Sequence, residues 1–91
     1  MMYVYLLESI SHPGERYIGI TSDLRRRLRD HNAAYSAGHT AKYRPWRLVT
    51  YIAFSDHVSA AAFETYLKSG SGHAFARKRL WQTSGAQENT R

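Results

Sequence analysis

Two runs of β-forming residues separated by a Pro-Gly pair place the strongest constraint on how this chain can fold. The runs are YVYLLES at residues 3–9 and RYIGITS at residues 16–22. Aromatic and β-branched residues favour strands, and the intervening ISHPGE segment carries residues typical of a turn. We therefore expect the chain to begin with a β-hairpin.

A helix is predicted directly after the second run. Thr21 or Ser22 can supply the N-cap, and the helical periodicity then continues to about residue 34. Asp23 would then lie in the first turn, where a negative charge is favourable. Residues 34–45 lack periodicity and contain Gly, Ser, Thr and Pro, so they predict a loop.

The next elements are a third strand and a second helix. WRLVTYIAF at residues 46–54 is strand-like, and SDHVSAAAFETYLKSG follows it with helical periodicity. Ser55 or Asp56 can cap this helix, and we expect it to end near Gly70 and Gly72.

The end of the chain predicts one more short helix, HAFARKRLW at residues 73–81, and then a polar tail over residues 83–91 that we expect to be frayed. A chain of 91 residues with 43% hydrophobic and 22% charged residues is typical of one globular domain, which we place at residues 1–82. The expected order is hairpin, helix, strand, helix, helix.

The charge balance indicates a polyanionic partner. Thirteen Lys and Arg against seven Asp and Glu leave a net charge of +6, which favours nucleic acid or an anionic membrane surface. The sequence has no cysteine, and its five histidines lack zinc-site spacing, so disulfides and a structural zinc site are not expected. The apolar start at residues 1–7 is too short for a signal peptide or a membrane span, and we expect a cytoplasmic protein.

The first predicted helix carries two polar residues on its apolar stripe. Leu24, Arg27, Leu28 and His31 fall at i, i+3, i+4 and i+7. Either Arg27 and His31 lie at the edge of the stripe and reach solvent along their stems, or the arginine is held facing a cleft. The other arginines of this helix predict a solvated basic face that attracts phosphates: Arg25, Arg26 and Arg29.

The second predicted helix carries one carboxylate next to its apolar stripe. Ala60, Phe63 and Leu67 form the stripe, and Glu64 stands four residues after Ala60. Such a glutamate is commonly exposed or paired with a basic neighbour. If Glu64 faces the same cleft as Arg27, it becomes a candidate ligand for Mg²⁺, which often takes only one or two protein carboxylates.

Tyrosines recur in the hairpin. Tyr3 and Tyr5 share one face of the first strand, and Tyr17 and Gly19 share a face of the second. Strand tyrosines commonly pack with the hydroxyl at the wet rim. A glycine inside a strand costs stability and often marks a bulge or the close approach of a ligand or another backbone, so Gly19 predicts one of these.

These features together resemble the GIY-YIG nuclease superfamily. The resemblance rests on YVY at residues 3–5, YIG at residues 17–19, Arg27 and His31 on the following helix, and Glu64 on the next. In the first motif Tyr and Val stand where the family name has Gly and Ile. The chain resembles the small single-domain branch, and is similar to the N-terminal domain of excision-repair nucleases and the catalytic domains of homing endonucleases.

The resemblance covers residues 2–82 and implies an α+β fold, a three-stranded antiparallel sheet flanked by helices. It implies a metal-dependent endonuclease that hydrolyses DNA phosphodiesters with Mg²⁺ or Mn²⁺. Because no DNA-binding domain is appended, we expect recognition of DNA structure or backbone, or targeting by a protein partner. RNA stays open as a substrate, since phosphate contacts carry no base information.

The resemblance also assigns roles. Arg27 would hold the scissile phosphate through its planar, permanently charged guanidinium, and Glu64 would bind the metal. Tyr17 or Tyr5 would deprotonate or orient the attacking water, assisted by the positive charge around it and by His31. Some family members carry a lysine soon after the YIG glycine, where this chain has Ile20 and Thr21; His31 or His39 could substitute.

The alternative hypothesis is a nucleic-acid-binding module without catalysis, in which Tyr43 or Trp46 stacks on bases. Its basic face would comprise Arg25, Arg26, Arg29, Lys42, Arg44 and Arg47. For the nuclease, we expect nucleic-acid contacts from Arg25, Arg26, Arg29, His39, Lys42 and Arg44. A membrane-surface role is disfavoured, because no helix pairs a broad apolar face with a uniformly basic one.

Overall fold

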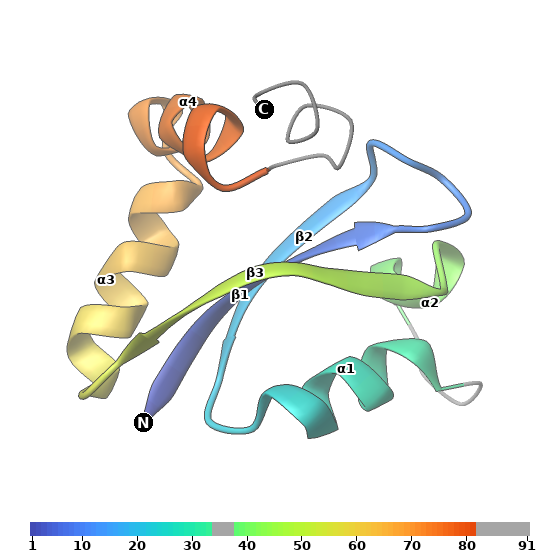
Figure 1. Ribbon diagram of the computed structural model, residues 1–91, viewed down its shortest axis with the longest axis horizontal. Coiled ribbons are helices and arrows are strands. Elements are labelled where there is room, and N and C mark those ends of the chain that lie inside the picture. Colours follow the sequence, from blue (N-terminus) through green and yellow to red (C-terminus); the bar gives the residue numbers. More distant parts are fainter. Residues whose placement is uncertain (34–37, 82–91) are drawn as a thin grey trace, which may run out of the picture.

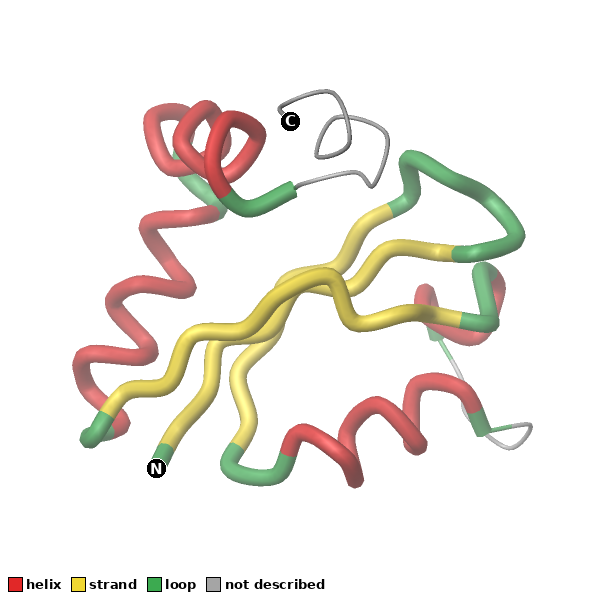
Figure 2. The backbone as a smooth tube through the Cα atoms, in the orientation of Figure 1, coloured by secondary structure: helices red, strands yellow, loops and turns green. Residues whose placement is uncertain are grey.

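The computed structural model describes residues 1–33 and 38–81, apart from the side chain of His39. In chain order the elements are β1 (Met2–Ser9), β2 (Arg16–Thr21), α1 (Leu24–Asn32), α2 (His39–Lys42), β3 (Trp46–Phe54), α3 (His57–Leu67) and α4 (Gly70–Arg79). The strands form an antiparallel sheet in the order β2-β1-β3, with α3 and α4 on one face and α1 on the other (Figures 1 and 2). The expected α+β fold is confirmed, while the predicted tail at residues 83–91 lies outside the described residues.

The central strand β1 is buried on both faces because helices cover both. Val4 and Leu6 pack toward Ala60 and Leu67 of α3 in one hydrophobic cluster. The other face holds Tyr5, Leu7 and Trp46, against which the α1 residues Leu24 and Leu28 pack. The apolar run of β1 therefore reflects a strand with no solvent face.

The predicted hairpin is confirmed and is held by a buried carboxylate. Glu8 accepts hydrogen bonds from Arg47 of β3 at 2.8 Å and from the backbone of Gly14 at 3.2 Å, and Arg16 lies 3.7 Å away. Gly14 has φ of 103°, a left-handed conformation that glycine adopts without steric cost. The Pro-Gly turn thus places the backbone donor that Glu8 uses.

The predicted N-cap of the first helix is wrong by one or two residues. Asp23 itself caps α1, its side chain accepting from the Arg26 N–H at 3.1 Å. Thr21 instead accepts from the Asp23 N–H at 3.0 Å, and holds the turn that gives Asp23 its extended backbone. The helix ends at Asn32, two residues before the expected end.

Two other boundaries differ from expectation. Gly70 and Gly72 do not stop α3, which ends at Leu67; Ser69 caps α4, and both glycines lie in its first turn. A Cβ at Gly72 would clash with the Tyr66 carbonyl, so close packing between α3 and α4 explains that glycine. The predicted loop at 34–45 contains α2.

The N-cap of α3 and the third strand agree with the sequence. Asp56, one of the two cap candidates, accepts from the Ser59 N–H at 2.7 Å. β3 spans the predicted residues 46–54. No helix in residues 1–33 and 38–81 is long and apolar enough to cross a membrane.

Candidate active site

Four of the side chains singled out in the sequence lie together on the α1 face of the sheet. The Tyr5 hydroxyl lies 3.0 Å from Nε2 of His31 in a buried hydrogen bond. The Tyr17 and His31 rings are 4.8 Å apart between centroids, and the Arg27 guanidinium lies close enough to the Tyr5 hydroxyl to interact with it. We call Tyr5, Tyr17, Arg27 and His31 the tyrosine-arginine cluster.

Gly19 creates the space for this cluster. It lies directly opposite Tyr5 in the β1–β2 register, and a Cβ there would lie 2.5 Å from the Tyr5 hydroxyl oxygen. The expected close approach is therefore real, but it comes from a tyrosine side chain rather than a ligand or another backbone. The bulge is elsewhere, between Leu6 and Leu7 where β1 pairs with β3.

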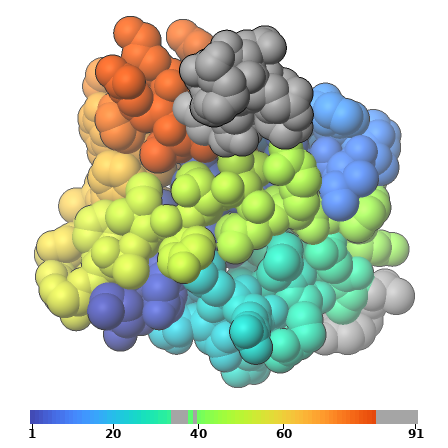
Figure 3. Space-filling model, in the orientation of Figure 1, coloured from blue at the N-terminus to red at the C-terminus, as the bar shows by residue number. Residues whose placement is uncertain are grey.

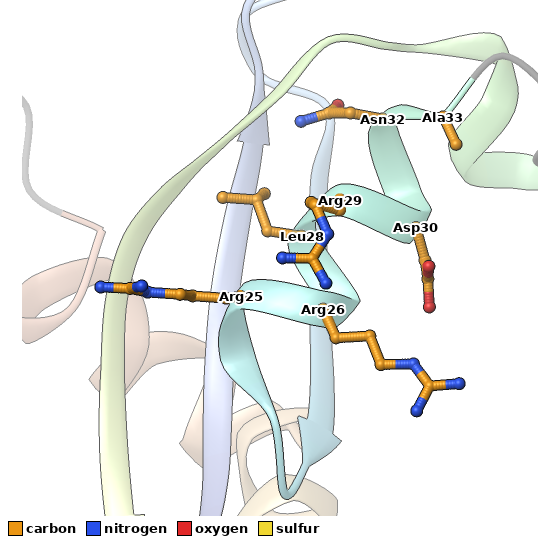
Figure 4. A pocket seen from close by; sticks show the side chains of 7 residues that line it. All are labelled: Arg25, Arg26, Leu28, Arg29, Asp30, Asn32 and Ala33. Atoms are coloured by element: carbon orange, nitrogen blue, oxygen red, sulfur yellow. The ribbon is translucent and has the colours of Figure 1, made fainter.

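The α1 stripe faces the sheet with its polar members included. His31 is only 5% exposed, and Arg27 is half-buried between the Tyr5 hydroxyl and Asp30, whose carboxylate lies 3.8 Å away. The cleft-facing interpretation of Arg27 thus fits the structure better than a solvent-reaching stem. Leu28 of the same stripe points toward the strands (Figure 4).

The remaining arginines of α1 form the predicted exposed basic face. Figure 4 shows Arg25 extending in the direction of β3, while Arg26 and Asp30 point away from the sheet. With Arg29 they line an open hollow on the outer side of α1. This surface can attract phosphates without taking part in the cluster.

Burial and charge set the protonation states of the cluster. Burial raises the pKa of Tyr5, an effect that the Arg27 hydrogen bond partly opposes. Burial, and then the charge of Arg27, lower the pKa of His31. At neutral pH the Tyr5 hydroxyl and the His31 ring are therefore both uncharged and share one hydrogen bond, beside the positive charge of Arg27.

Glu64 is on α3, the helix that covers the face of the sheet opposite α1. Its side chain is 21% exposed and accepts a hydrogen bond from Lys68 at 3.1 Å. Tyr17, on the edge strand β2, lines a pocket together with Leu67 of α3 and with Lys68, which follows that helix. The Glu64–Lys68 pair has the i, i+4 spacing that a sequence can reveal.

The donor set fits a sparsely liganded cation. Residues 1–33 and 38–81 contain no group of three or more His, Asp or Glu side chains that could enclose a metal ion. Mg²⁺ often takes a single carboxylate and completes its shell with water and substrate phosphate oxygens. The partly exposed carboxylate of Glu64 suits that mode of binding.

Several predicted nucleic-acid contacts have other roles in the fold. Trp46 is 2% exposed, and its Nε1 donates to the Thr40 carbonyl, so its predicted stacking on bases is wrong. Arg47 is paired with Glu8, and Arg44 donates to the Ala41 carbonyl at 3.1 Å. These groups stabilise the segment around α2.

Lys42, Arg44 and His39 stay candidates for nucleic-acid contact in this segment, since one hydrogen bond leaves Arg44 with further donors. Lys42 is exposed, with its ammonium 5.8 Å from the Tyr43 ring centroid. The side chain of His39 lies outside the described part of the chain.

Asn32 is a structural residue that the sequence reasoning missed. Its amide bonds the Trp46 N–H at 2.6 Å and carbonyl at 3.0 Å, tying α1 to β3 without any local sequence signal.

Comparison with known proteins agrees with this geometry. The GIY-YIG catalytic domain family matches residues 1–79. The chain is 42% identical over 65 residues to a structure-specific endonuclease subunit SLX1 homolog of Giardia intestinalis, covering 68% of this chain and 18% of that protein. It is 45% identical over 67 residues to the structure-specific endonuclease subunit SLX1 of Scheffersomyces stipitis, covering 67% of this chain and 20% of that protein.

The chain thus spans about a fifth of the length of these two curated relatives. A solved structure of similar size also resembles it: the solution NMR structure of a UPF0213 protein from Bacillus halodurans, with 30% identity and a TM-score of 0.51. That match covers 89% of this chain and 88% of the other. The fold, the ordered motifs and the match over residues 1–79 lead to one conclusion: this chain belongs to the GIY-YIG catalytic domain family.

Proposed function

We propose that this chain is a metal-dependent endonuclease that hydrolyses DNA phosphodiester bonds and is directed by the structure or backbone of the DNA. The observation that carries the proposal is the tyrosine-arginine cluster, where a half-buried guanidinium is held by a buried tyrosine. Two relatives named structure-specific endonuclease subunits support it.

Arg27 binds the scissile phosphate. Its guanidinium is anchored on one side by Tyr5, and as a half-buried group it keeps donors for a phosphate oxygen. A guanidinium held in advance loses little conformational freedom on binding and stabilises the charge that develops as the bond breaks. The exposed arginines of α1 raise the local concentration of the polyanion.

Tyr17 orients the attacking water, and Tyr5 is a positioning residue. Tyr5 is 2% exposed, its pKa is raised, and its hydroxyl is engaged by both Arg27 and His31. Tyr17 is more exposed, stands on the edge strand and lines a pocket. Of the two tyrosines, Tyr17 is therefore the one with access to solvent, while the hydrogen bond with His31 fixes the position of the Tyr5 hydroxyl.

Glu64 binds the divalent metal, Mg²⁺ or Mn²⁺. The bound ion would neutralise the phosphate and stabilise the leaving oxygen. The ammonium of Lys68 donates a hydrogen bond to the Glu64 carboxylate, so a metal ion can bind there only when this bond is broken. Lys68 lines the same edge pocket as Tyr17, and once released it can contact a substrate phosphate there.

A protein partner supplies substrate targeting. The relatives named above are subunits by name, and this chain matches only about a fifth of each. A cytoplasmic location is part of the proposal and rests on the absence of cysteine from the sequence.

Cleavage of end-labelled linear and branched DNA tests the function. Wild type, Glu64→Gln and Arg27→Ala are compared in Mg²⁺, Mn²⁺ and EDTA, with binding measured on the same DNA. Glu15→Gln, in the hairpin turn, is the control for loss of a carboxylate. We expect wild type and the control to cut only with metal, and Glu64→Gln to bind without cutting.

The alternative candidate is a binding module, which the exposed basic face of α1 favours. If wild type and Glu64→Gln bind equally and neither cuts any DNA with either metal, the endonuclease proposal is refuted in favour of that module.

A further inference from the structure

An exposed aromatic pair lies beside the tyrosine-arginine cluster. Tyr51 of β3 is 50% exposed and stands directly opposite Tyr5 in the antiparallel register. Tyr3, two residues before Tyr5 and on the same face of β1, packs its ring edge-on against Tyr51 with centroids 5.8 Å apart. We call Tyr3 and Tyr51 the aromatic platform.

Helix α1 covers only part of this face of the sheet. Leu24 and Leu28 pack over the half that contains Leu7 and Leu48. The half that contains Tyr51 and the exposed Ala53 reaches solvent, since β3 is an edge strand. Figure 3 shows β3 running across the front surface, with α1 below it and α4 above it. The platform is therefore open to a ligand.

The charge around the platform matches a nucleic acid. Figure 4 shows Arg25 extending from α1 in the direction of β3, and Arg27 lies in the cluster next to Tyr5. The whole chain carries a net charge of +6. Aromatic faces next to a basic groove are the combination that single-stranded nucleic acids use, with bases on the rings and phosphates on the cations.

The spacing relates the platform to the reacting phosphate. Directly opposed residues of antiparallel strands have Cβ atoms about 4.5–5.5 Å apart, so the side chain of Tyr51 starts beside that of Tyr5, whose hydroxyl lies over Gly19 of β2 and beside His31. A base resting on Tyr51 would belong to a nucleotide next to that phosphate. In a continuous duplex every base is already stacked and paired, whereas a branch or a single-stranded arm offers a free base.

We propose that Tyr51, supported by Tyr3, stacks on an unpaired base beside the scissile phosphate and so selects branched or single-stranded DNA over continuous duplex. This inference rests on the proposed function and names its substrate class. It assigns the open half of the sheet face to a nucleotide and not to a second copy of the chain.

Fluorescence of 2-aminopurine placed at the unpaired position of a forked DNA tests the platform, with anisotropy on the same forked DNA and on a continuous duplex. We expect Tyr51→Ala and Tyr51→Leu to lose the stacking signal and about 5- to 150-fold in affinity for the fork. Tyr51→Phe keeps both, and duplex binding is unchanged in all three. Tyr66→Ala, at a tyrosine of α3 that is 39% exposed, is the matched control.

Tyr51→Leu keeps an apolar side chain on the strand, so its loss of stacking with an unchanged thermal midpoint separates stacking from folding. The proposal would be overturned if Tyr51→Ala and Tyr51→Leu lost the same affinity for the fork and the duplex. It would also be overturned if both variants bound the fork as tightly as wild type does. In the second case, sedimentation that depends on concentration and is lost in Tyr51→Ala would assign the face to a second copy.

The readout needs no cleavage, so the two proposals can fail separately. Stacking without cutting in Mg²⁺ or Mn²⁺ would refute the endonuclease and support the platform. Cutting by wild type without the stacking signal would support the endonuclease and refute the platform.

Discussion

Replacing Gly19 with alanine inserts one methyl group into the tyrosine-arginine cluster. The new Cβ would lie 2.5 Å from the Tyr5 hydroxyl oxygen and 2.9 Å from Cε2 of Tyr17. The strand backbone at Gly19 is not left-handed, so the effect is purely steric. Relief requires the Tyr5 phenol to move away from residue 19, which changes its 3.0 Å hydrogen bond with His31.

The expected magnitude follows from two opposing effects. Overpacking a filled site costs about 1–3 kcal/mol, while alanine is favoured over glycine in a strand by about 0.5–1 kcal/mol. The net loss of unfolding free energy centres on about 1 kcal/mol, which for a domain of this size lowers the thermal midpoint by roughly 4–8 °C. Displacement of the phenol by a fraction of its width should reduce cleavage by up to about 100-fold.

Calorimetry and cleavage of forked DNA check both expectations. Gly70→Ala is the matched control, because a Cβ there has no neighbour within 4 Å at the start of α4. We expect the control to cleave like wild type and to be as stable or more stable by up to about 1 kcal/mol, because alanine is also favoured over glycine in a helix. If Gly19→Ala is as stable and as active as wild type, then Gly19 is not needed to seat Tyr5, and the reasoning from close packing is refuted.

Three further results are expected. Asn32→Ala leaves the Trp46 N–H without its 2.6 Å partner, which should cost about 1–3 kcal/mol in chemical denaturation; an unchanged midpoint would contradict the tie between α1 and β3. Lys68→Gln removes the cation that competes for Glu64, so Mn²⁺ affinity by titration calorimetry should rise about twofold, and a fall would contradict competition. The fold lowers the pKa of His31 below 6.5, so the unfolded chain binds the proton at a higher pH than the folded chain does. The contribution of His31 to the free energy of unfolding should therefore be at its maximum above pH 6.5 and should be lost as the pH falls through the lowered pKa. Chemical denaturation of His31→Gln across this pH range should show a flatter profile.

The hairpin, the three strands and the order of elements could be predicted because they depend on neighbouring residues. Alternation of β-formers, a Pro-Gly turn and helical periodicity are all local signals. The same locality explains the errors. Asp23 caps α1 instead of Thr21 or Ser22, because the geometry of the turn decides which of several neighbouring polar residues can reach the free N–H groups. Gly72 was wrongly predicted to end a helix, because a glycine is needed there for close contact with another helix.

The sequence alone also placed Tyr5, Tyr17, Arg27 and His31 as candidates, since strand and helix periods assign each residue to a face. Only the tertiary structure decided which faces oppose each other. It buried His31 against Tyr5, and it paired Glu64 with Lys68 on α3, the helix that covers the other face of the sheet. Contacts between residues far apart in the chain depend on how layers stack and which edge is left open, and no local pattern encodes those distances.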